Sequence, residues 1–440
     1  MRKIKLVIIP TILAAIAVFT ACVDEPNDRA FPADKYFHDI APVPVTEDYV
    51  VGAMYNEMSP GYWYEVVNNQ VFYSMPLAYT GHPLLGDTTG VEKNGGYYIN
   101  EDYSGGGAPA YPDKPAEAQG APGKLLKQQL QWGEDAGIDF FLISWNGKGT
   151  DTLLFNYKNT WTQGKPKIAI IFDCGHLLSS PTDSLHTSSR PNYVKTKLLR
   201  QLDSLKVFFD EPYYYKVNGS VPLFGLDNYL RVNSVLSLVD TVRKQLGDVY
   251  LITPTVTRGN GYTSPEYFVN IKNAVSIGND VKDVYLFREN GAKNGTPHIP
   301  FNAIYEPAML TDNYSRYGYD NWRRNFFSII DDNYSYWKQK MESDYNIEFI
   351  PSVMPAFDNS KNDTTSNLLR LPGTKTRLLQ RETNGSLYDT YANVGKKNAG
   401  KNRIILINSW NNYRQGSGLE PTTEYRDSYL EFTRKYFKKN

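Results

Sequence analysis

The residues best able to do chemistry are concentrated near the end of the chain, between Ile404 and Pro421. The stretch begins with an aliphatic run, 404–407, which is typical of a strand buried on both faces. A turn containing Gly416 and Gly418 closes it. Amide and aromatic side chains at a strand end can hydrogen-bond to a ligand and stack on it, but the same pattern suits an amide-rich turn that merely caps the strand. The polar and aromatic residues after the run are Asn408, Ser409, Trp410, Asn411, Asn412, Tyr413, Arg414 and Gln415.

Carboxyl side chains follow several other apolar runs, and a positioned carboxyl can exchange a proton with a substrate. Short carboxylates also cap loops and helices, so each of these residues has a structural alternative. We expect Asp358 and Asp173 to face a cleft, with Glu420 as a third catalytic candidate that could instead pair with Arg414 or Arg426. The carboxyls at strand ends are Glu57, Asp173, Glu306, Asp358 and Glu420.

The elements that must position these residues can be predicted from hydrophobic patterning. Apolar runs predict about eight strands, most of them separated by helices, with polar residues just after each strand. This is typical of a (β/α)8 TIM barrel of the α/β class with its site on the C-terminal face. An open doubly wound sheet is the alternative, but no G-x-G-x-x-G or P-loop turn follows any run. The predicted strands are 50–55, 138–144, 167–172, 221–226, 249–254, 283–287, 303–305, 348–353 and 404–407, and the predicted helices are 123–136, 191–209, 232–246, 322–345 and 425–436.

Aromatic residues at the strand ends are candidate platforms for a ligand. Tyr55, Trp145 and Trp410 each lie where a predicted strand ends, and the chain has 34 tyrosines and 7 tryptophans in all. Such rings stack on the C–H faces of sugars, but they also fill cores, so packing at the barrel mouth is the alternative. The long irregular region 80–122 could form one wall of a cleft or be a surface insertion.

The first 46 residues precede a predicted single domain, 47–440. A basic segment containing Arg2, followed by the apolar run 6–19, predicts a secretory signal over 1–21, because the run is shorter than the ~20 apolar residues of a membrane span. Cys22 lies where a cleavage site belongs, so we expect it to be lipidated, with plain signal cleavage as the alternative. Residues 22–46, rich in proline and aspartate, then form a tether.

Composition excludes several classes of function. Lysine plus arginine equals aspartate plus glutamate, 47 each, so no global charge favours nucleic acid as a partner. The two cysteines, Cys22 and Cys174, cannot form a disulfide framework if Cys22 is lipidated. No pair of the five histidines has the spacing of a helical metal site. We therefore expect neither a metal nor a cofactor.

Four segments of the chain resemble glycoside hydrolase family 99 and its relatives, including the WbsX-type proteins described as glycosyltransferases. The last segment is the most specific, because relatives carry Trp-Asn-Glu-Trp-x-Glu-Gly-x-x-Leu/Ile-Glu-Pro where this chain has Trp410 to Pro421. Asp24-Glu25 after the cysteine also resembles the export signal of Bacteroidetes surface lipoproteins. That implies a lipid anchor in the outer membrane, at the cell surface of a Gram-negative bacterium. The four segments are 127–145, 214–223, 351–359 and 407–421.

The resemblance implies retaining hydrolysis of an α-mannosidic bond through a 1,2-anhydro sugar. The first glutamate of the motif would act as base on the 2-hydroxyl and the second as general acid. These positions are Asn412 and Gln415, and amides cannot serve as acid or base near pH 7. General acid–base help contributes roughly a hundred- to ten-thousand-fold per group, so this chemistry requires other residues here.

Three functional hypotheses follow. The protein is a surface glycan-processing lipoprotein of polysaccharide utilisation that has moved its acid and base to other carboxyls. Alternatively, it is a pseudoenzyme that binds an oligo- or polysaccharide, such as an α-mannoside, without cleaving it. The third, a glycosyltransferase, lacks any sign of a sugar-nucleotide phosphate site. The candidate substrate-binding residues are Tyr55, Trp145, Trp410, Asn411, Asn412, Tyr413 and Gln415.

Overall fold

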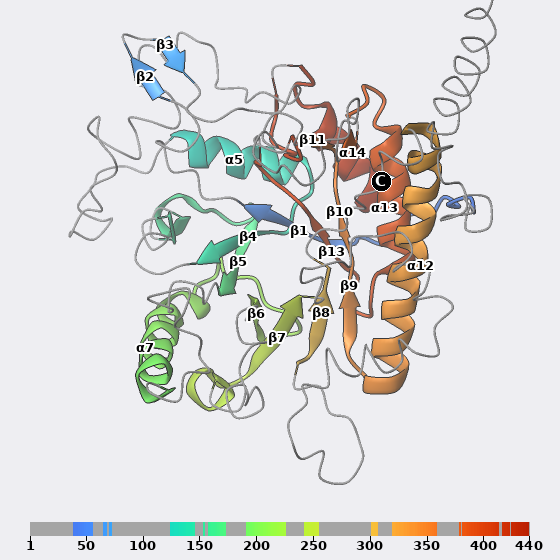
Figure 1. The fold of residues 1–440 in the computed structure, drawn as a ribbon. Helices are drawn as coiled ribbons and strands as arrows, with labels where there is room; N and C mark the ends of the chain where they lie inside the picture. The colour runs from blue at the N-terminus through green and yellow to red at the C-terminus, as the bar shows by residue number, and fades with distance from the viewer. Residues whose placement is uncertain are drawn as a thin grey trace, which may run out of the picture.

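The chain folds into a parallel barrel surrounded by helices, shown in a computed structural model (Figure 1). Within the described residues, one sheet has nine strands in the order β10-β13-β1-β4-β5-β6-β7-β8-β9. The structure describes residues 38–55, 65–67, 70–72, 124–145, 153–154, 157–172, 191–225, 242–254, 301–306, 319–358, 378–379, 381–412, 416–422 and 424–439.

All paired strands of this sheet are parallel, and the sheet closes on itself. β9 and β10 are two halves of one strand that Pro351 interrupts, since β9 pairs with β8 while β10 pairs with β13. The carbonyl of Pro351 accepts a hydrogen bond from the Leu406 N–H at 3.0 Å, which continues the ladder across the break. The predicted (β/α)8 barrel is therefore confirmed. Its strands are β1 (Val50–Tyr55), β4 (Phe140–Trp145), β5 (Lys167–Phe172), β6 (Val221–Gly225), β7 (Val249–Pro254), β8 (Ala303–Tyr305), β9 (Glu348–Ile350), β10 (Ser352–Val353) and β13 (Ile404–Ile407).

Alternate residues of each strand face two separate cores. In β4, Phe140 and Leu142 belong to the core inside the barrel, whereas Phe141, Ile143 and Trp145 belong to the core between strands and helices. Both faces of each strand are therefore buried and apolar, which is why the sequence shows continuous hydrophobic runs rather than alternation.

Helices cover the outside of the barrel (Figure 1). Figure 1 shows α12 and α13 on one side of the sheet and α7 on the opposite side. α12 contacts α13 and β9, α13 also contacts β10, and α14 packs against both α13 and α5. The bounds are α5 (Lys124–Asp135), α7 (Pro191–Phe209), α12 (Tyr319–Tyr345), α13 (Ser386–Asn398) and α14 (Ser428–Phe437).

Where the structure describes them, the predicted elements match this barrel closely, apart from one helix and two pairs of short strands that were not predicted. The predicted strand 283–287 and the loop 80–122 lie outside the described residues. The helix predicted over 232–246 is described only from 242, where 242–246 is helical. α13 was not predicted, because glycine and lysines break the apolar stripe of this helix. Two small antiparallel hairpins were also missed, β2 (Glu65–Val67) with β3 (Gln70–Phe72) and β11 (Phe357–Asp358) with β12 (Leu378–Leu379).

An N-terminal strap, defined here as residues 38–45, is held against α12 and α13. The His38 N–H donates to the Ser328 hydroxyl at 3.1 Å, and that hydroxyl donates to the His38 carbonyl at 2.8 Å. Further along, the Val43 N–H donates to Asn393 Oδ1 at 2.9 Å, and Lys396 Nζ donates to the Val43 carbonyl at 2.7 Å. The described end of the predicted tether is thus hydrogen-bonded to the barrel's helices.

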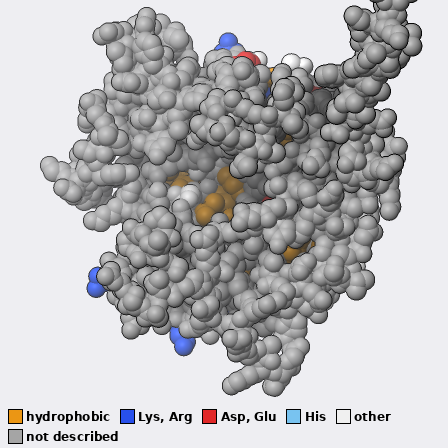
Figure 2. Space-filling view, viewed as in Figure 1, with side chains coloured by type: hydrophobic (Ala, Val, Ile, Leu, Met, Phe, Trp, Pro, Cys, Tyr) orange, Lys and Arg blue, Asp and Glu red, His pale blue; other side chains and the backbone are white. Residues whose placement is uncertain are grey.

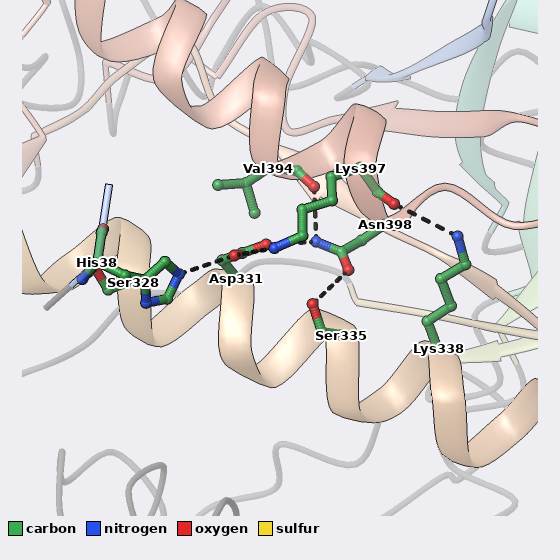
Figure 3. Close-up of polar contacts among 8 residues, drawn as sticks. All are labelled: His38, Ser328, Asp331, Ser335, Lys338, Val394, Lys397 and Asn398. Atoms are coloured by element: carbon green, nitrogen blue, oxygen red, sulfur yellow. Dashed lines mark hydrogen bonds and ion pairs between the residues drawn. The ribbon is translucent and has the colours of Figure 1, made fainter. Parts of the chain in front are cut away.

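Asp331 of α12 is the centre of this attachment (Figure 3). It accepts hydrogen bonds from His38 Nε2 at 2.9 Å, Lys397 Nζ at 2.6 Å and Asn398 Nδ2 at 2.9 Å. Burial alone would raise the pKa of Asp331, but the bonds from Lys397, His38 and Asn398 hold it below its usual range. The charged carboxylate therefore joins the strap, α12 and α13.

In the part of the chain that the structure describes, no helix is both long and apolar enough to cross a bilayer.

The N-terminal end of the barrel is closed by a buried network around Glu348. Its carboxylate accepts hydrogen bonds from the Tyr250 hydroxyl at 2.7 Å and from the side chain and backbone of Asn402 at 2.6 and 2.8 Å. A buried carboxylate needs such donors because it has lost its water. A cavity of about 360 Å³ near this end is lined by residues that include Asp139, Lys167 and Tyr215.

Candidate functional site at the barrel mouth

The C-terminal ends of the strands form the mouth of the barrel, the usual location of a site in this fold. Inward-facing positions are accessible there: Ser144 is exposed, and Met54 and Ile171 are partly exposed. Met54 and Ile171 also pack on the inner core. Figure 2 shows a hollow in this region of the molecule, over β1 and β4, with hydrophobic side chains on its floor. The mouth therefore offers a recess with an apolar base.

The loop after β13, residues 408–421, is called the site loop below, and its two arms are hydrogen-bonded to each other. The Ser409 N–H donates to the Ser417 carbonyl at 3.0 Å, and the Leu419 N–H donates to the Ser409 carbonyl at 3.0 Å. The Glu420 N–H donates to the Trp410 carbonyl at 2.8 Å. A Cβ at Gly418 would lie 3.1 Å from that carbonyl, so only glycine fits without a shift. The arms are thus tightly paired.

Asn412 is held by its backbone within this loop. Its N–H donates to Ser409 Oγ at 2.8 Å, and its carbonyl accepts from the Ser417 N–H at 3.2 Å. Asn412 is partly exposed, whereas the neighbouring Asn411 is fully buried. Asn412, the first of the two amides that the resemblance places at glutamate positions, therefore has a hydrogen-bonded backbone and is partly exposed. The second amide, Gln415, and the neighbouring Tyr413 lie outside the described residues.

Trp410 and Trp145 are packed in the outer core. Trp410 is 0 % exposed, its ring centroid lies 4.8 Å from that of Phe141, and its backbone N–H donates to the Met54 carbonyl at 2.7 Å. Trp145 is 1 % exposed and stacks on Phe172 at 5.4 Å. The geometry favours the packing alternative for both rings, because each belongs to the layer between strands and helices.

Tyr55 and Glu420 are joined through a third buried residue, Gln129 of α5. The Tyr55 hydroxyl donates to Gln129 Oε1 at 2.7 Å, and Gln129 Nε2 donates to Glu420 Oε1 at 3.0 Å. Glu420 is 1 % exposed. The arrangement ties the end of the site loop to β1 and α5, which is a structural contact. This contact gives Glu420 a structural partner, while its predicted pairing with Arg414 and its catalytic role stay predictions, since Arg414 lies outside the described residues.

Arg381 binds the backbone of the site loop, and sequence reasoning did not predict it. The guanidinium donates to the carbonyls of Gly416, at 3.2 Å, and Gly418. It lies 4.4 Å from the ring centroid of Tyr429 and 5.5 Å from that of Tyr425. No pattern around residue 381 marks it, because its partners are 35 and 37 positions away.

The remaining predicted residues are placed only in part. Asp358 ends β11, where its backbone pairs with Leu378, and its carboxyl is not among the described side chains. Asp173 and Glu57 lie outside the described residues, as does Cys22. Glu306 is buried and lies close enough to Tyr334 and Tyr391 to help raise the pKa of both hydroxyls, an effect dominated by burial. The catalytic roles of Asp358 and Asp173 stay predictions.

The described residues also limit the available chemistry. No group of three or more histidine, cysteine, aspartate or glutamate side chains that could hold a metal occurs among them. The described part of the site loop offers a partly exposed amide residue, Asn412, at the mouth, whose recess has an apolar floor. Such groups suit hydrogen bonding to hydroxyls and contact with the C–H face of a sugar.

Comparison with known proteins points to glycan-active barrels. Residues 190–433, more than half of the chain, match the family model described as Glycosyltransferase WbsX. A solved structure described as "Glycoside hydrolase-like protein" has a TM-score of 0.59 and 18 % identity, covering 93 % of this chain and 100 % of its own. The GH99 endo-alpha-mannosidase from Bacteriodes thetaiotaomicron, in complex with BIS-TRIS-Propane, has a TM-score of 0.51 and 16 % identity, covering 89 % and 97 %. At these identities the likeness is one of fold. No curated protein matches the chain in sequence.

Proposed function

The chain belongs to the family described as Glycosyltransferase WbsX, and we propose that it processes an oligo- or polysaccharide containing α-mannosides at the mouth of its barrel. The observation that carries the proposal is the position of the site loop: it follows the last strand of a barrel similar in fold to an endo-alpha-mannosidase. In that place the loop carries the partly exposed Asn412, and its Trp410 backbone N–H binds the carbonyl of Met54, one of the partly exposed inward positions of the mouth.

Asn412 would bind substrate rather than transfer a proton. Its backbone is fixed by Ser409 and Ser417, so its amide can hydrogen-bond sugar hydroxyls at low entropic cost. Gln415, three positions later, would do the same. Glycosidic cleavage then needs two carboxyls about 5–10 Å apart. We propose Asp358 and Asp173 for these roles, since in sequence Asp173 directly follows β5 and Asp358 lies five residues after β10.

The same amides support a second candidate, a glycan-binding protein without catalytic activity. Amides at both glutamate positions of the family motif would keep the hydrogen bonds and abolish acid–base chemistry. Transfer from a sugar nucleotide has less support, because no G-x-G-x-x-G or P-loop turn follows any strand in the sequence.

One experiment separates the two candidates. Purified protein is incubated with yeast mannan and with host N-glycans; binding is measured by calorimetry and new reducing ends by product analysis. Release by wild type that is lost in Asp358→Asn, with binding retained, supports the enzyme. Binding with no release by wild type supports the binding protein. Release that is unchanged in both Asp358→Asn and Asp173→Asn would refute the assignment of these carboxyls.

The double variant Asn412→Glu with Gln415→Glu tests the substrate class. If the rest of the mouth fits an α-mannoside, restoring both carboxyls should create or raise mannosidase activity, by roughly a hundredfold or more for each group that acts. Asn412→Gln is the matched control, because it lengthens the same side chain as Asn412→Glu does without adding a carboxyl. Equal activity in the double variant and this control would count against a mannoside.

We also propose that Cys22 carries lipid and anchors the protein in the outer membrane, at the cell surface of a Gram-negative bacterium. The basic and apolar signal 1–21, the cysteine at its end and the Pro- and Asp-rich segment after it support this. Metabolic labelling with a fatty acid tests it. Incorporation by wild type and not by Cys22→Ser is expected, and equal labelling of the two would overturn the assignment.

A further inference from the structure

We propose that Arg381 is a positioning residue that locks the site loop against the connection between β10 and α13. The inference rests on the proposed function, because the loop it holds forms part of the same mouth. Its support comes from two sets of contacts of one buried side chain and from the position of residue 381 in the chain.

The first contact is with the backbone of the site loop. The guanidinium donates to the carbonyls of Gly416 and Gly418, which flank Ser417. The Ser417 N–H in turn donates to the Asn412 carbonyl, and the Ser417 carbonyl accepts from the Ser409 N–H. Arg381 thus holds one arm of the loop, and that arm holds Asn412. Gln415 directly precedes the first carbonyl that Arg381 binds.

The second contact keeps the guanidinium itself in place. It lies over Tyr429 of α14 at 4.4 Å, and Arg381 is only 5 % exposed. The Tyr425 hydroxyl donates to the Arg381 carbonyl at 3.2 Å, and the Tyr429 hydroxyl donates to the Glu382 carbonyl at 2.8 Å. A planar guanidinium donates from its edge while its flat face lies over a ring, whereas a compact ammonium on a different stem has no flat face to stack in this way. The geometry therefore calls for arginine specifically.

The third observation is the position of residue 381 in the chain. It follows β12, which pairs with β11, and β11 ends in Asp358. Arg381 therefore links two segments. One is the connection between β10 and α13, which contains Asp358, and the other is the site loop, which contains Asn412. A displacement of ~1 Å between reacting groups can cost on the order of a hundredfold in rate, so a clamp between these segments would set the geometry of the mouth.

The test compares Arg381→Lys with Arg403→Lys. Arg403 is a matched control, because it also donates to two carbonyls, of Glu47 and Asp48, and lies over a tyrosine ring, but at the other end of β13. We expect Arg381→Lys to speed hydrogen exchange at the amides of Ser417, Leu419 and Glu420 and to weaken yeast mannan binding about tenfold, the effect of losing one charged hydrogen bond. Arg403→Lys should change neither.

A rescue experiment separates positioning from general destabilisation. Millimolar guanidinium chloride should slow loop exchange in Arg381→Ala and restore its mannan affinity, while sodium chloride at equal ionic strength should not. If Arg381→Ala does not fold, the hydrogen exchange and mannan affinity of Arg381→Lys test the positioning role by themselves. Loop exchange in Arg381→Lys that matches wild type would overturn the clamp. Faster exchange with unchanged mannan affinity would also overturn the positioning role.

Failure of the proposed function gives a different pattern. If wild type does not bind mannan, the proposed substrate is wrong, and the exchange measurement then decides on Arg381 by itself. Faster exchange confined to the site loop in Arg381→Lys would support the clamp whatever the ligand, and exchange equal to that of Arg403→Lys would refute it.

Discussion

The two ends of β13 are held by arginines that make the same contacts in different surroundings. Arg403, at the N-terminal end, donates to the carbonyls of Glu47 at 2.8 Å and Asp48 at 3.2 Å and lies 3.9 Å from the ring centroid of Tyr49. Arg381, at the C-terminal end, donates to Gly416 and Gly418. The contacts of Arg403 are exposed to solvent, and those of Arg381 are buried.

This difference in burial accompanies a difference in role between the two ends of the barrel. At the N-terminal end, the residues bonded to Glu348 come from strands or from turns just before strands, so their contacts stabilise the fold. At the C-terminal end, a side chain from outside the sheet fixes the backbone of a loop, and the loop's own side chain at Asn412 stays accessible. We therefore expect changes at the first end to alter stability alone and changes at the second to alter ligand binding as well.

The largest effect is expected for Glu348→Ala. Removing this buried carboxylate leaves the Tyr250 hydroxyl and two N–H groups of Asn402 without their acceptor, so the free energy of unfolding should fall by about 3 kcal/mol or more. Urea denaturation measures this, and mannan affinity at a temperature well below the transition should equal that of wild type. Glu431→Ala, at an exposed position of α14, is the control. A loss of affinity at full folding would break the division between the two ends.

Gly418→Ala, unlike Glu348→Ala, should lower mannan affinity as well as the free energy of unfolding. The new Cβ would lie 3.1 Å from the Trp410 carbonyl, so the site loop must shift, at a cost of about 1–3 kcal/mol. Because the shift falls on the arm paired with Asn412, mannan affinity should fall even where the protein is fully folded. Gly219→Ala is a useful contrast, since nothing lies within 4 Å of its added Cβ although its φ is +88°. Equal affinity for both variants and wild type would argue against the loop as a binding element.

Asp331→Asn should lower the free energy of unfolding by about 1–2 kcal/mol at pH 7, because it weakens the attachment of the N-terminal strap. The pKa of Asp331 is lowered in the folded protein, so its stabilising contribution is present above the aspartate pKa of the unfolded chain and is lost as pH falls through the folded-state value. The difference in unfolding free energy between wild type and variant should therefore shrink below about pH 4. Asp203→Asn, an exposed ion-pair variant on α7, is the control. A difference that grows as the pH is lowered would contradict this account.

The smallest effect is expected for Arg403→Lys. Exposed charged contacts contribute little, so the change in unfolding free energy should be below about 1 kcal/mol, measured by urea denaturation. Lysine retains the charge over Tyr49 and one carbonyl contact. A loss comparable to that of Arg381→Lys would show that burial is not what distinguishes the two arginines.

Much of the barrel could be predicted from the sequence, because its strands are buried on both faces and appear as uninterrupted apolar runs. β1, β5 and β7 have the predicted bounds. That same property hides which residues face inward, since Ser144 and Trp145 are neighbours in one run and only the closed sheet shows that Ser144 is the exposed one. The predicted platforms Trp145 and Trp410 are therefore found in the outer core.

The motif from Trp410 to Pro421 likewise predicted the loop and its place after the last strand, because these are properties of residue type and order. It could not reveal what holds the loop. The contacts of Arg381 with Gly416 and Gly418, and of Gln129 with Glu420, join residues 35 to 291 positions apart. Such pairs meet only when the sheet closes and α5, α13 and α14 pack around it, so the support of the site was decided by the tertiary structure alone.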